Sequence, residues 1–210
     1  MNIQLAVKNI VINGTFSPQK FDKYFFLKKE IFNEGVIADS SIFLTDFCII
    51  NTKKIHIQIT QEQLIITEMT SDTLVSIMDI AEKIIKQTEF LATASGINFH
   101  YYKFTSDDIH QLSKKYFFNA NSEVNKYFSN DDVSYGYYLS KDFKGTRLKL
   151  DMKPATIQRA DSSANERIIQ FQFNFHSDFT EQSNTEQLLE VIKNYKIYFN
   201  ETQQIISLYE

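Results

Sequence analysis

Residues 167–177 read Arg-Ile-Ile-Gln-Phe-Gln-Phe-Asn-Phe-His-Ser, and this stretch decides the fold. From Ile169 to His176 the apolar and polar side chains alternate without a break. Successive side chains of a β-strand point to opposite faces of a sheet, so the alternation predicts a strand with one buried face and one polar face. A sheet that packs a single face on the core is typically antiparallel.

Two more strands are predicted just before this one. Residues 133–140 and 146–159 are separated by a turn at 142–145, and a polar turn at 160–165 leads into 167–177. Short turns join antiparallel neighbours, so the three segments predict a meander. Pro154 has no amide proton to donate, which places the middle strand at a sheet edge or makes it bulge there.

The N-terminal part of the chain shows related patterns. Strands are predicted at 2–12, 41–50, 55–60, 64–69 and 97–104, and helices at 17–32, 72–89 and from 106 onward. A hairpin followed by a helix occurs twice, at 55–89 and 146–199, which suggests a duplication. We therefore predict an α+β fold with a largely antiparallel sheet of about seven strands and helices packed on one face.

The stretch 119–132 is rich in Asn, Ser and Asp and predicts a loop around a short helical turn. This loop divides the chain into an N-terminal lobe, 1–118, and a C-terminal lobe, 119–210. Val124, Tyr127 and Phe128 within the loop are apolar enough to favour burial. The two lobes are therefore expected to share one core and form a single domain.

The C-terminal residues carry a stripe of apolar side chains at alternating spacings of four and three. This heptad spacing predicts one long helix, or two helices broken near Asn200. Few helices keep so regular a stripe unless they face another helix, either in the same chain or in a second copy of it. We expect a second copy, with the interface made by Leu188, Ile192, Tyr195, Phe199, Ile206 and Tyr209.

A basic segment suggests an alternative function. Arg147, Lys149 and Lys153 share one side of the strand predicted at 146–159. Pairing the polar faces of this strand and the next places Lys149 opposite His176 and Lys153 opposite Gln172. Arg147, Lys149, Lys153, Gln172 and His176 would then form a ribbon of donors suited to phosphates of a nucleic acid. The simpler interpretation is an ordinary solvated sheet face.

Three histidines suggest a second alternative, a metal-dependent enzyme. His56, His100 and His176 each lie on the polar side of a predicted strand, so their rings would converge if these strands were neighbours. No close ligand spacing supports a metal site. Hydrogen-bonded or solvated histidines explain the pattern better, and we predict no metal ion and no cofactor.

Composition limits the remaining functions. The net charge of −4 does not favour nucleic acid, and Cys48 is the single cysteine. No apolar run reaches the roughly 18 residues that a membrane-spanning helix needs, so we expect no membrane contact and a cytoplasmic location. Phosphate-binding loops and common hydrolase motifs are absent from the sequence. The leading hypothesis is a non-catalytic interaction or assembly protein that forms a homo-oligomer.

Overall fold

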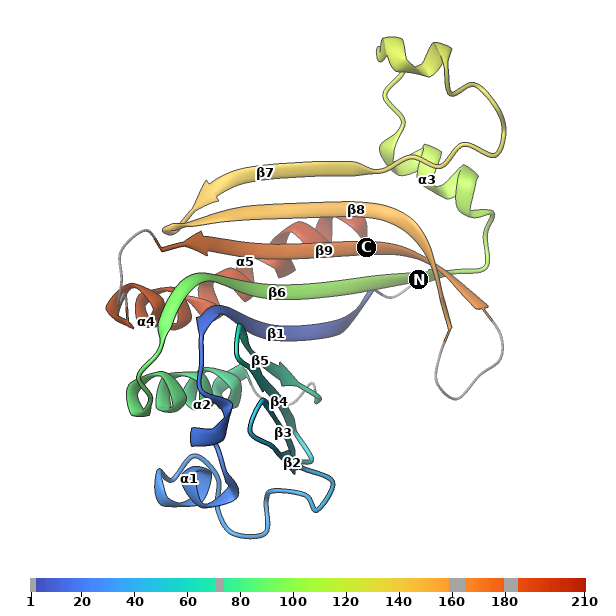
Figure 1. Cartoon of the computed structure of the whole chain (residues 1–210). Coiled ribbons are helices and arrows are strands. Elements are labelled where there is room, and N and C mark those ends of the chain that lie inside the picture. Colours follow the sequence, from blue (N-terminus) through green and yellow to red (C-terminus); the bar gives the residue numbers. More distant parts are fainter. Residues whose placement is uncertain (1–2, 71–73, 159–164, 180–184) are drawn as a thin grey trace.

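The computed structural model describes residues 3–70, 74–158, 165–179 and 185–210. These residues form a nine-stranded antiparallel sheet in the order β2-β3-β4-β5-β1-β6-β9-β8-β7, shown in Figure 1. The strands are β1 (Ile3–Thr15), β2 (Ile42–Phe43), β3 (Phe47–Asn51), β4 (Ile55–Thr60), β5 (Gln63–Glu68), β6 (Leu91–Thr105), β7 (Tyr137–Phe143), β8 (Thr146–Gln158) and β9 (Asn165–Asp178). The helices are α1 (Lys23–Lys28), α2 (Leu74–Gln87), α3 (Ile109–Phe117), α4 (Thr185–Lys193) and α5 (Tyr195–Ile206), with 3-10 turns at Pro18–Lys20, Glu123–Lys126 and Ser207–Tyr209.

The predicted fold class, α+β with a large antiparallel sheet, is confirmed. The prediction of about seven strands is too low, partly because the apolar run 41–50 is not one strand. It divides into β2 and β3, which pair with each other across a turn in which the Leu44 amide donates to the Phe47 carbonyl at 3.0 Å. Thr45 and Asp46 occupy this turn, and such short polar residues favour turns over strands.

The topology repeats a unit that is larger than the predicted hairpin and helix. β1, α1, the meander β3-β4-β5 and α2 follow one another in the first half. β6, α3, the meander β7-β8-β9 and α4 follow in the same order in the second half. β1 and β6 lie antiparallel at the centre of the sheet, with Asn9 opposite Asn98 in the middle of their ladder. The second unit therefore begins at β6, ahead of the lobe boundary predicted at residue 119.

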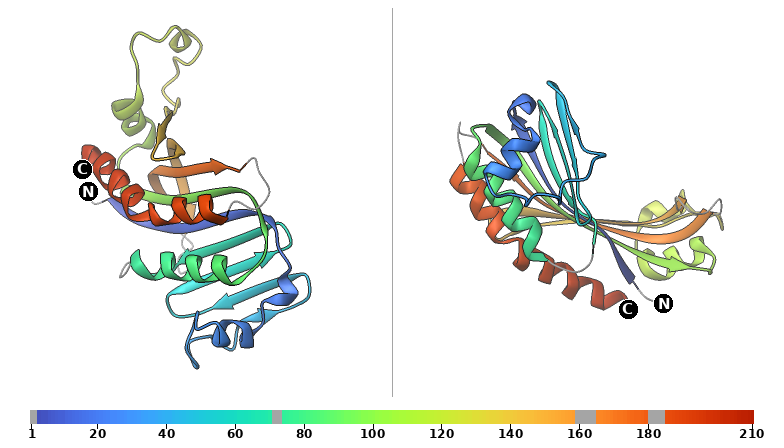
Figure 2. Two further views of the ribbon diagram at one scale, coloured as in Figure 1. Left: turned by 90° about the vertical axis from the view of Figure 1, so that its left-hand side faces the viewer. Right: turned by 90° about the horizontal axis from the view of Figure 1, so that it is seen from below.

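One face of the sheet is covered by α2, α4 and α5, as the right-hand view of Figure 2 shows. Inward side chains of the central strands, such as Ile97, Phe99, Phe173 and Phe175, are fully buried beneath these helices. A single hydrophobic cluster runs from Ile3 to Ile206 and includes residues of both halves. Within the described part of the chain, no helix is long and apolar enough to cross a membrane.

Candidate functional surface

The predicted interface on the C-terminal helix is packed inside the chain. Tyr195 and Phe199 contact Phe99 on β6, with ring centroids 5.1 and 5.5 Å apart, and Tyr209 contacts Phe171 on β9 at 5.0 Å. Leu188, Ile192, Tyr195 and Ile206 are at most 3% exposed. The stripe therefore packs on the sheet of the same chain, and Leu188, Ile192, Tyr195 and Ile206 are buried there, whereas Phe199 and Tyr209 remain half-buried.

The helix is also interrupted earlier than predicted. α4 ends at Lys193 and α5 begins at Tyr195, so the break falls at Asn194 and not near Asn200. The side of the helix that is buried changes after this break. Tyr198 is fully buried although it lies outside the heptad stripe. Tyr198 stacks on Phe175, with ring centroids 4.5 Å apart, and its hydroxyl donates to the Lys144 carbonyl at 3.1 Å.

The opposite face of the sheet, here called the open face, carries a continuous row of polar side chains. Cross-strand pairing aligns them, and directly paired residues point to the same face. The amide of Asn98 donates to Asn9 at 2.7 Å and accepts from Asn174 at 2.6 Å, which joins three central strands. The row consists of Asn51, His56, Thr67, Asn9, Asn98, Asn174, Lys149 and Ser140.

The five residues of the predicted anion surface lie together on the open face, but their predicted register is wrong. Lys149 pairs with Asn174 rather than His176, and Lys153 pairs with Gln170 rather than Gln172. His176 is opposite Arg147, and Gln172 is opposite Asp151. The shift is two residues, which preserves the face of every side chain, so alternation alone could not detect it.

Carboxylates neutralise most of the positive charge on this surface. Lys153 forms an ion pair with Asp151 at 2.5 Å, and His176 contacts Asp178 at 2.9 Å. Arg147 forms an ion pair with Asp142 at 3.0 Å. Of the two lysines and one arginine in the set, Lys149 alone has no carboxylate within 4 Å among the described residues. The electrostatic attraction that phosphates would require is therefore weak here.

The three histidines are spread over the open face and do not converge. His176 is paired with Gly96, four residues along β6 from His100, which corresponds to about 13 Å. His56 lies on β4, three strands away from β6, which corresponds to about 14 Å. Ligands of one zinc ion lie only about 2 Å from it, so these rings cannot share an ion. Burial lowers the pKa of His100, and the ring of His56 is hydrogen-bonded to Asn51 at 2.7 Å.

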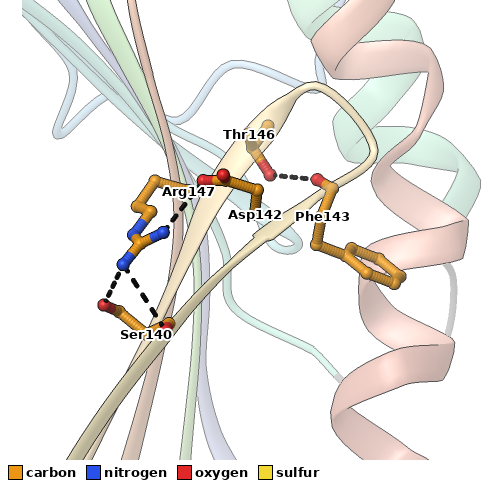
Figure 3. A network of polar contacts seen from close by, with 5 residues as sticks. All are labelled: Ser140, Asp142, Phe143, Thr146 and Arg147. Carbon is orange, nitrogen blue, oxygen red and sulfur yellow. Dashed lines mark hydrogen bonds and ion pairs between the residues drawn. The ribbon is translucent and has the colours of Figure 1, made fainter.

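Arg147 instead binds the outermost strand of its own sheet, as Figure 3 shows. Its guanidinium donates to Asp142 at 3.0 Å, to the Ser140 hydroxyl at 2.7 Å and, at the longer distance of 3.5 Å, to the Ser140 carbonyl. The strand turns back at Lys144 and Gly145, whose φ angles of 47° and 78° are those of a type I′ hairpin turn. The Thr146 hydroxyl closes this turn by donating to the Phe143 carbonyl at 2.8 Å.

The hairpin geometry shows which backbone groups of β7 face outward. Phe143 and Thr146 flank the two-residue turn and therefore form a hydrogen-bonded pair, and bonded and non-bonded pairs alternate along the ladder. The amide and carbonyl groups of Tyr138, Ser140 and Asp142 consequently point away from β8. In the sheet of described residues β8 is the single neighbour of β7, so these groups face no second strand.

The β7 edge is also rich in exposed apolar side chains. Every residue of β7 before Phe143 is exposed, including Tyr138 at 63% and Leu139 at 54%. Val124, Tyr127 and Phe128, for which the sequence predicts burial, are exposed in the segment before β7 at 57%, 86% and 54%. The sequence does not reveal this edge, because Tyr138 and Leu139 look like ordinary strand residues until the strand order is known.

Comparisons with family models, with curated proteins and with solved structures find no match to this chain.

Proposed function

We propose that the protein acts by association, as an assembly protein that dimerises through the β7 edge. The observation that carries the proposal is a seven-residue strand at the end of the sheet, with six exposed residues and outward-facing backbone groups. Unpaired edges of this kind template pairing with another strand unless they are blocked. The other end of the sheet is blunted, because β2 has only two residues.

The sequence of β7 is complementary to itself. Two identical antiparallel edge strands are related by a twofold axis perpendicular to the sheet, so one residue must pair with its own copy across that axis. Centring on Lys141 or Asp142 would place like charges opposite each other, which is destabilising. Centring on Ser140 places Tyr137 opposite the partner's Phe143, an aromatic pair of the kind that stabilises sheets.

The same register also pairs complementary polar side chains on the open face of both copies. Tyr138 would stand opposite the partner's Asp142, and its hydroxyl is a donor suited to that carboxylate. Arg147 obstructs this pairing only slightly, because its bond to the Ser140 carbonyl is long, at 3.5 Å. Its stronger bonds go to side chains, which leaves the backbone edge able to pair.

A cysteine on the proposed axis tests both the dimer and its register. Directly paired residues in an antiparallel ladder have Cα atoms about 5.5 Å apart, which lies within the disulfide range. We expect Ser140→Cys to form a covalent dimer under mild oxidation, and the exposed control Ser207→Cys to remain monomeric. The natural cysteine, Cys48, is buried and should contribute no background.

Light scattering measures the association without a cross-link. The wild type should be a dimer, and Ser140→Lys should dissociate it by placing two ammonium groups opposite each other on the axis. Ser140→Thr is the matched control and should remain dimeric. A wild-type protein that is monomeric up to about 100 µM, where even an affinity of about 10 µM would show, would overturn the proposal.

A further inference from the structure

A cavity of about 610 Å³ lies in the N-terminal half, away from the β7 edge. Its walls come from the loop after α1, from the turn between β3 and β4, and from α2. Its volume falls within the range of about 300–1,000 Å³ that is typical of small-molecule sites. The apolar walls include Phe32, Val36, Ile55 and Ile80.

The cavity is built on segments that are tied together by hydrogen bonds. The Ala38 amide donates to the Asn51 carbonyl at 2.8 Å, which joins the loop after α1 to the end of β3. In the β3–β4 turn, the Thr52 hydroxyl accepts from the amides of Lys54 at 3.2 Å and Ile55 at 2.8 Å. The Lys54 carbonyl in turn accepts from the Met69 amide at 2.7 Å. The shape of the cavity is therefore set before any ligand binds.

The charge at the cavity has one sign. Lys53 and Lys54 both line it and are both exposed, and no acidic residue is among the described lining residues. Lysines at such a position lay their aliphatic stems along apolar surface and keep their ammonium groups in water. An occupant that complements both features has an apolar chain and an anionic head.

We propose that this cavity binds a single-chain amphiphile with an anionic head, such as a long-chain carboxylate. The alkyl chain packs against Phe32, Val36 and Ile80, and the carboxylate meets the ammonium groups of Lys53 and Lys54 at the mouth. Placing the head at the mouth keeps the charge hydrated, while the chain leaves water for an apolar surface. The site does not depend on the proposed dimer.

Calorimetric titration with dodecanoate below its critical micelle concentration tests the site. We expect one dodecanoate per chain, with dodecyltrimethylammonium binding at least about tenfold more weakly because its head is cationic. The double variant Lys53→Glu with Lys54→Glu should weaken dodecanoate binding by at least about tenfold. The matched control, Lys114→Glu with Lys115→Glu, makes the same charge change on exposed residues of α3 and should bind as the wild type does.

A second variant separates the cavity from non-specific attraction to lysines. Val36 lies in the cavity wall and is 42% exposed, so Val36→Trp should fill the cavity without disturbing the core. We expect this variant to lose dodecanoate binding while its urea midpoint stays near that of the wild type. Absence of saturable binding to the wild type would overturn the proposal, as would equal affinity for the two amphiphiles or unchanged binding by Val36→Trp.

Discussion

An ion pair inside the core provides the sharpest test of how this fold is stabilised. Lys8 on β1 and Glu68 on β5 are cross-strand neighbours, with Nζ and Oε2 3.0 Å apart. Their side chains are 5% and 0% exposed, and the Lys8 ammonium also donates to the Thr70 carbonyl at 2.9 Å. The buried Tyr195 lies near enough that, after burial itself, the charge of Glu68 helps to raise its pKa. Both charges are thus held out of water by a shared environment.

Removing one partner of this ion pair should lower the free energy of unfolding far more than removing both. Lys8→Met leaves the Glu68 carboxylate buried without its cation, and Glu68→Leu leaves the ammonium with only a carbonyl. Breaking a buried pair in this way typically costs about 3–5 kcal/mol. Replacing both by apolar residues removes the desolvation penalty of both charges, and such exchanges are often neutral or stabilising. The free energy of unfolding of the double variant should therefore lie within about 1 kcal/mol of that of the wild type.

Urea unfolding of the wild type, both single variants and the double variant gives the coupling energy directly. We expect coupling of at least about 3 kcal/mol. The surface pair Lys86–Glu82 on α2, at 2.5 Å, is the control, and its coupling should stay below about 1 kcal/mol because water screens it. Single variants that each cost under about 1 kcal/mol, or costs that simply add, would refute this account of the core.

Three further expectations concern the β7–β8 turn and buried titrating groups. Tyr198→Phe removes the hydroxyl that binds the Lys144 carbonyl and should lower the free energy of unfolding by about 1 kcal/mol in urea titrations. Lys144 has a φ of 47°, so Lys144→Asn should raise that free energy by about 0.5–1 kcal/mol, and a lower value would contradict the turn assignment. Burial raises the pKa of Cys48 from 9.0 to about 12 and lowers that of His100 below 6.5. Between pH 9 and about 12 the Cys48 thiol therefore ionises in the unfolded chain only. Below pH 6.5 the His100 imidazole is protonated more readily in the unfolded chain than in the folded one. Stability should therefore fall above pH 9 and below pH 6.5, and His100→Gln should reduce the acid-side loss.

Side-chain alternation predicted faces correctly and registers incorrectly. In β8 and β9 it placed Arg147, Lys149 and Gln172 on the same face, where the structure has them. A period of two is unchanged by a shift of two residues, so the pairing of Lys149 with Asn174 could not follow from it. Register in a hairpin depends on the connecting segment; here the turn predicted at 160–165 contains no glycine to indicate a turn type, and residues 160–164 lie outside the described residues.

The stripe on the C-terminal helix illustrates a different ambiguity. A helix that lies on a sheet needs one apolar stripe, and so does a helix in a coiled coil. Over the short span from Leu188 to Tyr209 the two requirements produce nearly the same spacing. The burial of Tyr198, which lies beside the stripe, shows the wider face that a sheet covers. Only knowledge of the sheet's extent could have distinguished the two cases.

The difference between the two topological units places the proposed interface on β7. β3 occupies the position in the first unit that β7 occupies in the second, at the outer end of its meander. The outer side of β3 is covered by β2, and Asn51 at its end binds the preceding loop through Ser41 at 3.0 Å. A fold selected for solubility alone would gain from covering both edges in this way. One unit closes its edge and the other leaves its edge open, and this asymmetry supports association through the strand that stays open.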